Sequence, residues 1–309
     1  MPRENTVVIL GVFVADTAYR AERMPRMGET ILGQGFALGP GGKGSNQAVA
    51  AARLAAEVHF VGRLGDDAFA DMALETWEAA GVRPAVVRDA SSYTGAAFIF
   101  VDAASGDNAI IISPGAAARI GPADVEARAE LIGRAAVFMT QLEQPLDAAG
   151  RGLEIAREGG VTTILNPAPG RALSDAVLGL CDWVTPNETE AAALTGLPVD
   201  GVAAARAAAD LLVARGAGGA VITLGAQGAL LYTPGVSELV PAVAAGPVVE
   251  TTGAGDAFNA GFAVGLARGM APADAVRLGC AVAGISVTRP GTAPSMPTLA
   301  EVEALMRRG

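Results

Sequence analysis

Short runs of β-branched and other apolar residues alternate along the chain with alanine-rich stretches of helical spacing. The apolar runs predict central strands at Thr6–Val12, Val58–Val61, Ala136–Met139, Thr162–Leu165, Trp183–Thr185 and Ala220–Thr223. The stretches between them predict helices at Asn46–Leu54, Phe69–Ala80, Asp147–Glu158, Glu188–Thr195, Ala203–Ala214, Ala257–Arg268 and Ala273–Ala283. This order is typical of a parallel sheet that helices cover, so the sequence predicts an α/β protein.

Two segments interrupt this alternation. Tyr93 to Ser113 reads as two strands joined by a turn at Ser105-Gly106-Asp107-Asn108, which is a hairpin pattern. Residues Thr17 to Leu38 lack helical periodicity and contain one proline and several glycines. Strands inserted in an α/β core often cover a substrate, but they can equally extend the sheet or form a dimer contact.

Composition narrows the class of protein. The chain has 309 residues with 22 Lys or Arg against 32 Asp or Glu, which gives a formal net charge of −10. Nucleic acids and anionic membranes are bound through basic surfaces, so neither is expected as a partner. With 51% hydrophobic residues and no run near the ~18 apolar residues of a membrane span, we expect a globular cytoplasmic protein. Lys43 is the one lysine of the chain.

Cysteine and histidine offer little metal chemistry. Cys181 and Cys280 each lie in an apolar segment, so we expect core residues rather than a disulfide framework or a zinc site. His59 is the only histidine and lies within a predicted strand. A metal site built from several histidines is therefore excluded, and a structural role is expected for His59.

A first glycine cluster has the spacing G-x-G-x-x-G at Gly39, Gly41 and Gly44. Its context does not fit dinucleotide binding. The residues before it are glycine-rich, and the strand after it ends without an acid that could bind a ribose hydroxyl. It is not a Walker A loop either, because Lys43 is followed by glycine. Lys43 and Asn46 on this turn can present donors to a polyhydroxylated ligand, or they can be a solvated lysine beside a helix cap.

A second cluster, Gly253-Ala254-Gly255-Asp256, opens an apolar helix. Small residues allow backbone N–H groups to converge on an anion, and the helix dipole favours negative charge there. A carboxylate at such a site repels the anion, so its presence there needs a structural or chemical reason. Asp256 is thus either a plain helix cap or a general base that takes a proton from an attacking hydroxyl.

Further acids follow predicted strands. Asn187 and Glu190 have the spacing of a capping box, and carboxylates at this place can also hold the water shell of Mg²⁺. Glu143 and Asp16 also come just after apolar runs. In an open α/β sheet the carboxyl ends of the strands line the ligand crevice, so these acids are candidates for one site.

Eight motifs occur together between Gly11 and Ser295. They are Gly41-Gly42-Lys43-Gly44-x-Asn46-Gln47, Gly65-Asp66-Asp67, Gln141-Leu142-Glu143, Asn166-Pro167-Ala168-Pro169, Thr185 to Glu190, Thr223-Leu224-Gly225, Gly253 to Asp256, and Val287-Thr288-Arg289. In this order and spacing the chain resembles the ribokinase-like (PfkB-type) family of sugar kinases. The resemblance implies one Rossmann-like three-layer domain over residues 1–309 with a mainly parallel sheet. It also implies a small β-strand lid, formed by segments of about 13–38 and 93–113, and a homodimer clasped through that lid.

The same resemblance implies a role for each matching residue. Asp256 matches the general base, and Gly253, Ala254 and Gly255 match the anion hole. Sugar contacts are implied for Asp16, Gly42, Lys43, Asn46 and Glu143. ATP and Mg²⁺ are assigned to Asn187, Glu190, Thr223, Leu224, Gly225, Gly228, Gly255 and Cys280. An activating K⁺ is assigned to Glu250, Thr252, Ser286, Arg289, Gly291 and Ser295.

Two positions depart from the family pattern. Val14 stands in the sugar site where ribokinases have Asn, and the similar deoxyribokinases also have an apolar residue there, so a sugar hydroxyl loses an amide partner. Glu250 replaces the usual Asp and changes the reach of a cation ligand by about one methylene.

The resemblance implies ATP-dependent phosphorylation of D-ribose at O5. A deoxyribokinase or another sugar or nucleoside kinase of the family is the alternative. More distant alternatives are an NAD-dependent oxidoreductase that uses the Gly39 to Gly44 spacing and a sugar-binding protein without catalysis.

Overall fold

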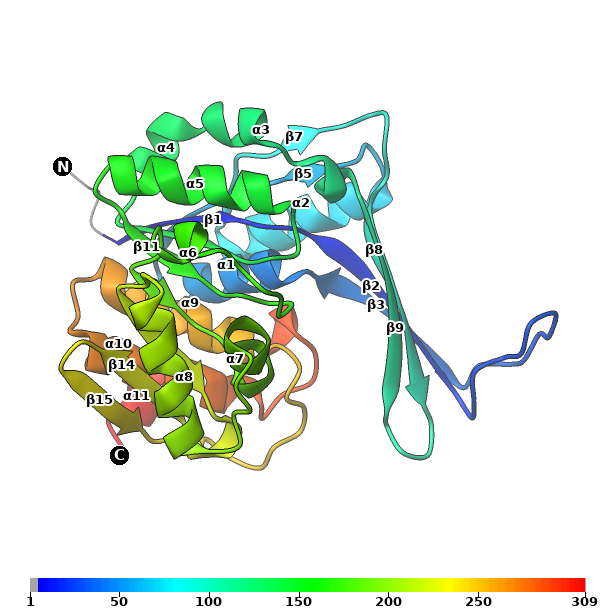
Figure 1. Cartoon of the computed structure of the whole chain (residues 1–309). Coiled ribbons are helices and arrows are strands. Elements are labelled where there is room, and N and C mark those ends of the chain that lie inside the picture. The colour runs from blue at the N-terminus through cyan, green and yellow to red at the C-terminus, as the bar shows by residue number, and fades with distance from the viewer. Residues whose placement is uncertain (1–4, 309) are drawn as a thin grey trace.

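A nine-stranded sheet forms the centre of the computed structural model, which describes residues 5–308 (Figure 1). Its strand order is β15 (Val236–Val240), β14 (Ala229–Thr233), β13 (Gly219–Thr223), β12 (Trp183–Val184), β11 (Thr162–Leu165), β10 (Val137–Thr140), β1 (Thr6–Leu10), β4 (Glu57–Val61) and β6 (Arg83–Pro84). Every pair is parallel except β13–β14 and β14–β15. The carboxyl ends of the parallel strands therefore meet at one edge.

Apolar side chains on both faces of this sheet explain the two helical layers. On β1, Val7 and Ile9 belong to one core, and Val8 and Leu10 belong to the other. The first core is completed by α1 (Lys43–Arg53), α2 (Ala68–Ala80), α9 (Ala254–Ala267), α10 (Pro272–Ser286) and α11 (Leu299–Met306). The second is completed by α3 (Pro122–Glu126), α4 (Ala129–Gly133), α5 (Leu146–Glu158), α6 (Asp175–Leu178), α7 (Glu188–Thr195) and α8 (Val202–Ala214).

The predicted α/β architecture is confirmed. All six apolar runs form strands, and these six are neighbours in the sheet, from β13 to β4. All seven predicted helices are present, with ends that differ by up to three residues. The hairpin β14–β15 was not predicted from the sequence, because a five-residue apolar run can also belong to a buried helix. Within residues 5–308, no helix is both long and apolar enough to cross a membrane.

The two irregular segments form a separate four-stranded sheet, which we call the lid. Its order is β3 (Gly35–Gly41), β2 (Val14–Ala21), β8 (Thr94–Asp102) and β9 (Asn108–Gly115). A turn joins β8 to β9, as predicted, but the connection covers residues 103–107 and not 105–108, because Asn108 already begins β9. The lid strands run away from the helical body (Figure 1). They do not extend the central sheet, and the lid continues two to three residues beyond the predicted ends 38 and 113.

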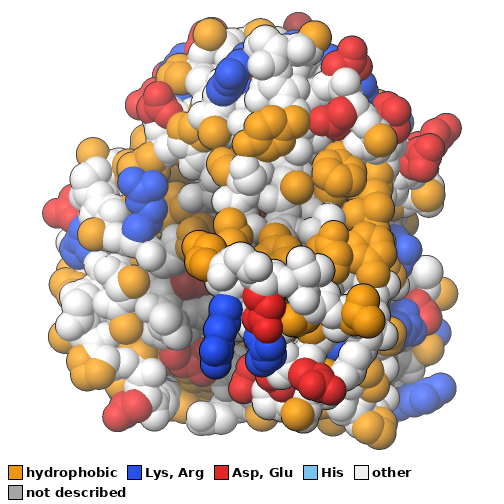
Figure 2. Space-filling view, turned by 90° about the vertical axis from the view of Figure 1, so that its right-hand side faces the viewer, with side chains coloured by type: hydrophobic (Ala, Val, Ile, Leu, Met, Phe, Trp, Pro, Cys, Tyr) orange, Lys and Arg blue, Asp and Glu red, His pale blue; other side chains and the backbone are white. Residues whose placement is uncertain are grey.

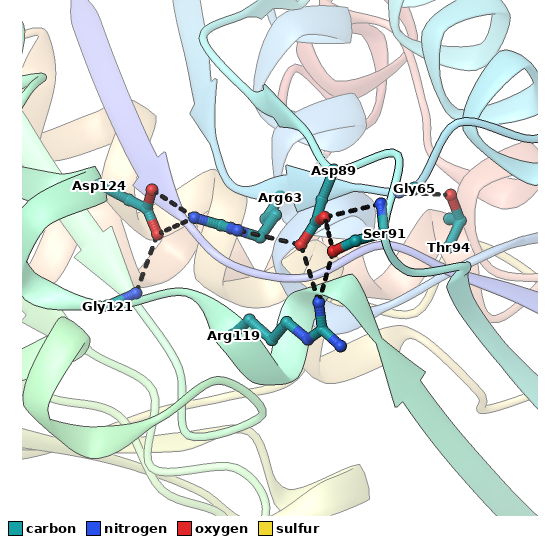
Figure 3. Close-up of polar contacts among 8 residues, drawn as sticks. All are labelled: Arg63, Gly65, Asp89, Ser91, Thr94, Arg119, Gly121 and Asp124. Atoms are coloured by element: carbon teal, nitrogen blue, oxygen red, sulfur yellow. Dashed lines mark hydrogen bonds and ion pairs between the residues drawn. The ribbon is translucent and has the colours of Figure 1, made fainter.

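A cluster of charged side chains fixes the root of the hairpin β8–β9 (Figure 3). Arg63, on β5 (Arg63–Leu64), pairs with Asp89 at 3.0 Å and with Asp124 at 2.8 Å. Arg119 donates a 2.8 Å hydrogen bond to the hydroxyl of Ser91. Ser91 precedes β8 and Arg119 follows β9, so the cluster ties both ends of the hairpin to the body.

Candidate active site

A cavity of about 150 Å³ lies at the carboxyl edge of the central sheet. Residues that follow β11 and β12, and the last residue of β13, lie there beside the beginnings of α1 and α9. Its lining consists of Lys43, Asn166, Ala168, Thr185, Asn187, Glu190, Thr223, Gly253, Gly255, Asp256 and Asn259. This is the edge at which open α/β sheets bind their ligands.

A larger hollow of about 330 Å³ lies at the other end of β1. Thr6, at the amino end of that strand, lines it together with Arg128, Glu130 and Arg134 of the α4 region. None of the residues proposed from the sequence for catalysis or binding lies in this hollow. Seven of the proposed residues line the smaller cavity, namely Lys43, Asn187, Glu190, Thr223, Gly253, Gly255 and Asp256, whereas the sugar candidates Asp16, Gly42, Asn46 and Glu143 are not part of its lining.

Asp256 lies in the first turn of α9 and is 7% exposed. The cap of this helix is Gly253, whose φ of 82° suits glycine, so the interpretation of Asp256 as a plain cap is wrong. The carboxylate accepts hydrogen bonds from Asn46 Nδ2 at 3.1 Å and from Gln47 Nε2 at 3.0 Å. Burial raises the pKa of Asp256, and the charge of Lys43 opposes this shift. An acid held and buried in this way is typical of functional sites.

Lys43 is half-buried at the beginning of α1. Burial lowers the pKa of its ammonium group, but the charges of Asp256, Glu143 and Glu190 outweigh this and raise it. Its backbone N–H donates to Glu143 Oε2 at 2.9 Å. Asn46 is a buried residue within α1, bonded to Asp256, so the interpretation of these residues as a solvated lysine beside a helix cap is wrong.

Two further carboxyl groups belong to the predicted sugar site. Burial raises the pKa of Glu143 to about 7 and that of Asp16 to about 6. Asp16 lies on β2 and its carboxyl group covers Gly41 so closely that a Cβ there would be 2.2 Å from Oδ2. Val14, which is 6% exposed, is on the same face of β2 because side chains alternate along a strand.

Asn187 and Glu190 form the predicted capping box of α7. Asn187 Oδ1 accepts from the N–H of Glu190 at 2.8 Å, and Glu190 Oε2 accepts from the N–H of Asn187 at 2.9 Å. Both residues also line the cavity, so the cap and a ligand role are compatible. Only one oxygen of Glu190 is used in the cap, and its carboxylate can therefore hold water molecules of a hydrated Mg²⁺.

The residues matched to the nucleotide are not all at the cavity. Thr223 lines it, and Gly225 and Gly228 shape the turn after β13 with φ angles of 52° and 105°. The side chain of Cys280 lies in the first hydrophobic core and that of Leu224 in the second, and neither lines the cavity. The prediction that Cys280 is a core residue is therefore confirmed. Cys181 is likewise buried in a core.

The segments matched to K⁺ lie side by side. The N–H groups of Val249 and Glu250 donate to the carbonyl of Val287, and Gly291 N–H donates to Glu250 Oε2 at 2.8 Å. Ser286 and Ser295 donate their hydroxyls to nearby backbone carbonyls. The guanidinium of Arg289 pairs with Glu301, so that side chain is not directed to a cation. Among residues 5–308, no three His, Cys, Asp or Glu side chains form a metal-binding group.

Several polar residues at the site were not singled out as site residues from the sequence. Gln47, Thr185 and Asn259 are buried and bonded near Asp256. Asn166, in a motif that had no role assigned, lines the cavity. Two signals could have found Gln47: it ends the motif Gly41 to Gln47, and its amide precedes a run of alanine and valine in α1.

The fold and the site define an α/β phosphotransferase with a hydroxyl acceptor. The family model for pfkB family carbohydrate kinases matches residues 4–299, and the chain belongs to this family. It is 37% identical to a ribokinase of Haemophilus influenzae, with 96% of this chain and 97% of that protein covered. It is 36% identical to a deoxyribokinase of Salmonella typhi, with 95% and 96% covered. The structure of Arabidopsis thaliana ribokinase complexed with ribose and ATP superimposes with a TM-score of 0.93 at 31% identity, covering 99% of both chains.

The family assignment decides against an oxidoreductase. Gly39 and Gly41 lie on β3, an antiparallel lid strand, whereas a dinucleotide fingerprint follows a parallel strand of the central sheet. His59 lies on β4, where its ring nitrogen is 3.1 Å from Glu57 Oε1, and it is not part of the cavity lining.

Proposed function

We propose that the protein is an ATP-dependent sugar kinase that phosphorylates D-ribose at O5. The observation that supports this most is the buried carboxylate of Asp256 at the beginning of α9, in one cavity with Lys43 and Glu190. The relatives named ribokinase support the sugar, and the Arabidopsis structure with ribose and ATP supports the nucleotide.

In this reaction Asp256 takes the proton of the sugar hydroxyl as its oxygen attacks the γ-phosphorus of ATP. The bond between that phosphorus and the β–γ bridging oxygen breaks, and ADP leaves. The backbone N–H groups of Gly253 and Gly255, at the beginning of α9, would stabilise the charge on the transferred phosphoryl group, whereas the N–H of Ala254 already donates to the carbonyl of Thr251 at 3.1 Å. Asp16, Lys43, Asn46 and Glu143 would bind the sugar hydroxyls.

Asn187, Glu190 and Thr223 would lie against the nucleotide phosphates. Glu190 would hold Mg²⁺ through its water shell, and the ion would neutralise phosphate charge. Burial raises the pKa of Glu190, so a cation beside it stabilises the ionised form.

An ADP-release assay over ribose, 2-deoxyribose, hexoses and nucleosides tests this function. We expect the highest kcat/KM with a pentose. Sugar binding without ADP release would identify a binding protein instead, and a clear preference for nucleosides would assign a nucleoside kinase.

The same assay in KCl and in NaCl at equal ionic strength tests the cation site. We propose that K⁺ binds among the 250–252 and 286–295 segments, because backbone hydrogen bonds already hold them together. We expect a higher rate in K⁺. Equal rates would show that Glu250 has lost the cation function.

Val14 favours 2-deoxyribose as a second candidate substrate, because its methyl groups stand where an amide would bond a hydroxyl. We expect Val14→Asn to raise the ratio of kcat/KM for ribose over 2-deoxyribose about tenfold, the equivalent of one hydrogen bond of ~1.4 kcal/mol. Ala18→Asn, on the same face of β2 but beyond Asp16, is the matched control and should leave the ratio unchanged. An unchanged ratio in Val14→Asn would show that this side chain does not contact the distinguishing hydroxyl.

We also propose that two copies associate through the lid. β9 is an edge strand with Ile110, Ile111 and Ile112 exposed by 52%, 65% and 55%, and hydrophobic side chains gather across the lid face in Figure 2. Large exposed apolar patches mark interaction sites. Light scattering should give a dimer for the unchanged chain and a monomer for Ile111→Lys. Val236→Lys, on the edge strand β15, should remain dimeric; a monomeric unchanged chain would contradict the proposal.

A further inference from the structure

Hydrogen bonds connect a group of buried polar side chains to Asp256, the proposed base. Gln47 and Gln141 are fully buried, and Asn166, Thr185 and Asn259 are 6%, 1% and 2% exposed. Polar side chains are rarely buried unless hydrogen bonds satisfy them. The proposed reaction assigns no role to these residues.

Gln47 is the centre of this group. Its Nε2 donates to Asp256 Oδ1 at 3.0 Å and to Asn166 Oδ1 at 3.1 Å. Its Oε1 accepts a hydrogen bond from Gln141 Nε2. Both N–H donors of the Gln47 amide and its carbonyl are therefore in use.

The orientation of the Gln47 amide follows from a backbone group that can only accept. The carbonyl of Thr185 accepts from Asn166 Nδ2 at 3.0 Å, so Asn166 must turn its Oδ1 toward Gln47. A flipped Gln47 would place its oxygen against that oxygen and against the carboxylate of Asp256. The chain of contacts thus fixes which atom of Gln47 faces the base.

The second oxygen of Asp256 has a different environment. Oδ2 accepts from Asn46 Nδ2 at 3.1 Å, and Asn46 is a proposed sugar ligand. Within residues 5–308, Asn46 Oδ1 is buried without a hydrogen-bond partner, so it is free to accept from a sugar hydroxyl. Oδ2 therefore faces the side from which the sugar arrives, and Oδ1 faces the protein.

We infer that Gln47 is the positioning residue of Asp256: it holds Oδ1 and leaves Oδ2 as the oxygen that takes the proton of the sugar hydroxyl. The charged groups facing Asp256 are Lys43, Glu190 and Glu143. They act on its charge at longer range, whereas the Gln47 amide is neutral and fixes its orientation. This inference rests on the proposed function of Asp256 as the base.

The test is a double-mutant cycle. Gln47→Met keeps the volume of the side chain and removes the donor to Oδ1, and we expect kcat to fall about 10- to 100-fold, the usual effect of one hydrogen bond to a charged group. The KM values for ribose and ATP should stay within about threefold, because the Gln47 side chain is fully buried and its N–H groups and carbonyl are all bonded to other side chains of the protein. In the Asp256→Asn background the same substitution should cost less than about twofold, because the base on which it acts is gone.

Gln141→Met provides a second variant if Gln47→Met does not fold. It leaves the contact between Gln47 and Asp256 in place and removes the hydrogen bond that Gln141 donates to the carbonyl of Gln47. We expect a smaller loss of kcat, about 3- to 10-fold, again with unchanged KM values.

The outcomes separate this inference from the proposed function. Unchanged kcat in the Gln47 and Gln141 variants, or a full loss that recurs in the Asp256→Asn background, would overturn the positioning role alone. Near-normal turnover of Asp256→Asn itself would overturn the role of the base, and the inference with it.

Discussion

Replacing Asp256 by Asn is expected to lower kcat by about 10²- to 10⁴-fold, the usual contribution of a general base. The amide has the same size, but its single oxygen can accept from only one of the two donors, Asn46 Nδ2 or Gln47 Nε2, and it cannot take the proton of the sugar hydroxyl. The fold and the KM for ATP should change little, because Asp256 is neutralised and not removed. Initial rates of ADP release, with ATP binding measured by calorimetry, provide both quantities.

Asp274→Asn is the matched control for this substitution. Asp274 is an exposed acid in the first turn of α10, the helix that follows α9. It pairs with Arg277 on the surface, and we expect normal kcat. If Asp256→Asn kept kcat within about tenfold of the unchanged enzyme, Asp256 would not be the base.

Replacing Trp77 by Ala is expected to lower the free energy of unfolding by about 3–5 kcal/mol, the usual cost of removing a large buried aromatic side chain. Trp77, on α2, is fully buried. Its ring centroid is 4.5 Å from that of Phe60 on β4 and 5.9 Å from that of Phe13 before β2. Its Nε1 donates to the hydroxyl of Ser45 on α1 at 3.0 Å. One side chain thus joins the core to the segment that leads into the lid.

Urea unfolding followed by circular dichroism measures this effect. Trp77→Phe keeps most of the ring contacts and loses the hydrogen bond, so we expect a smaller loss of about 1–2 kcal/mol. Leu197→Ala, at a 37% exposed position, should change the free energy by less than about 0.5 kcal/mol. A loss below about 1 kcal/mol for Trp77→Ala would show that the surrounding side chains fill the space.

Local patterns could be predicted from the sequence, and this is why the strands from β4 to β13 were correctly placed. The capping box of Asn187 and Glu190 could be predicted for the same reason, since its hydrogen bonds span three residues. Asp256 could be proposed as a site residue because it follows a glycine cluster at the beginning of an apolar helix. Its alternative as a cap could be rejected only when the structure placed Gly253 at that position.

Contacts between distant residues could not be predicted. Gln47 bonds Asn166 across 119 positions and Asp256 across 209 positions, and the order of residues within α1 shows neither contact. The core position of Leu224 has the same explanation, because burial depends on which helices and strands pack together. The core position of Cys280 was predicted from its apolar segment, and only the family resemblance assigned either residue to the nucleotide.

The charged root of the lid has a consequence for how substrate preference can evolve. Arg63, Asp89 and Asp124 secure the hairpin β8–β9, whereas Val14 and Asp16 stand on β2, which enters the lid by another connection. If Val14 and Asp16 contact the sugar as proposed, substitutions of their side chains would change its recognition and leave in place both the charged attachment and the backbone pairing of β2 with β8. Such separation allows selection to test new substrates on a scaffold that stays folded.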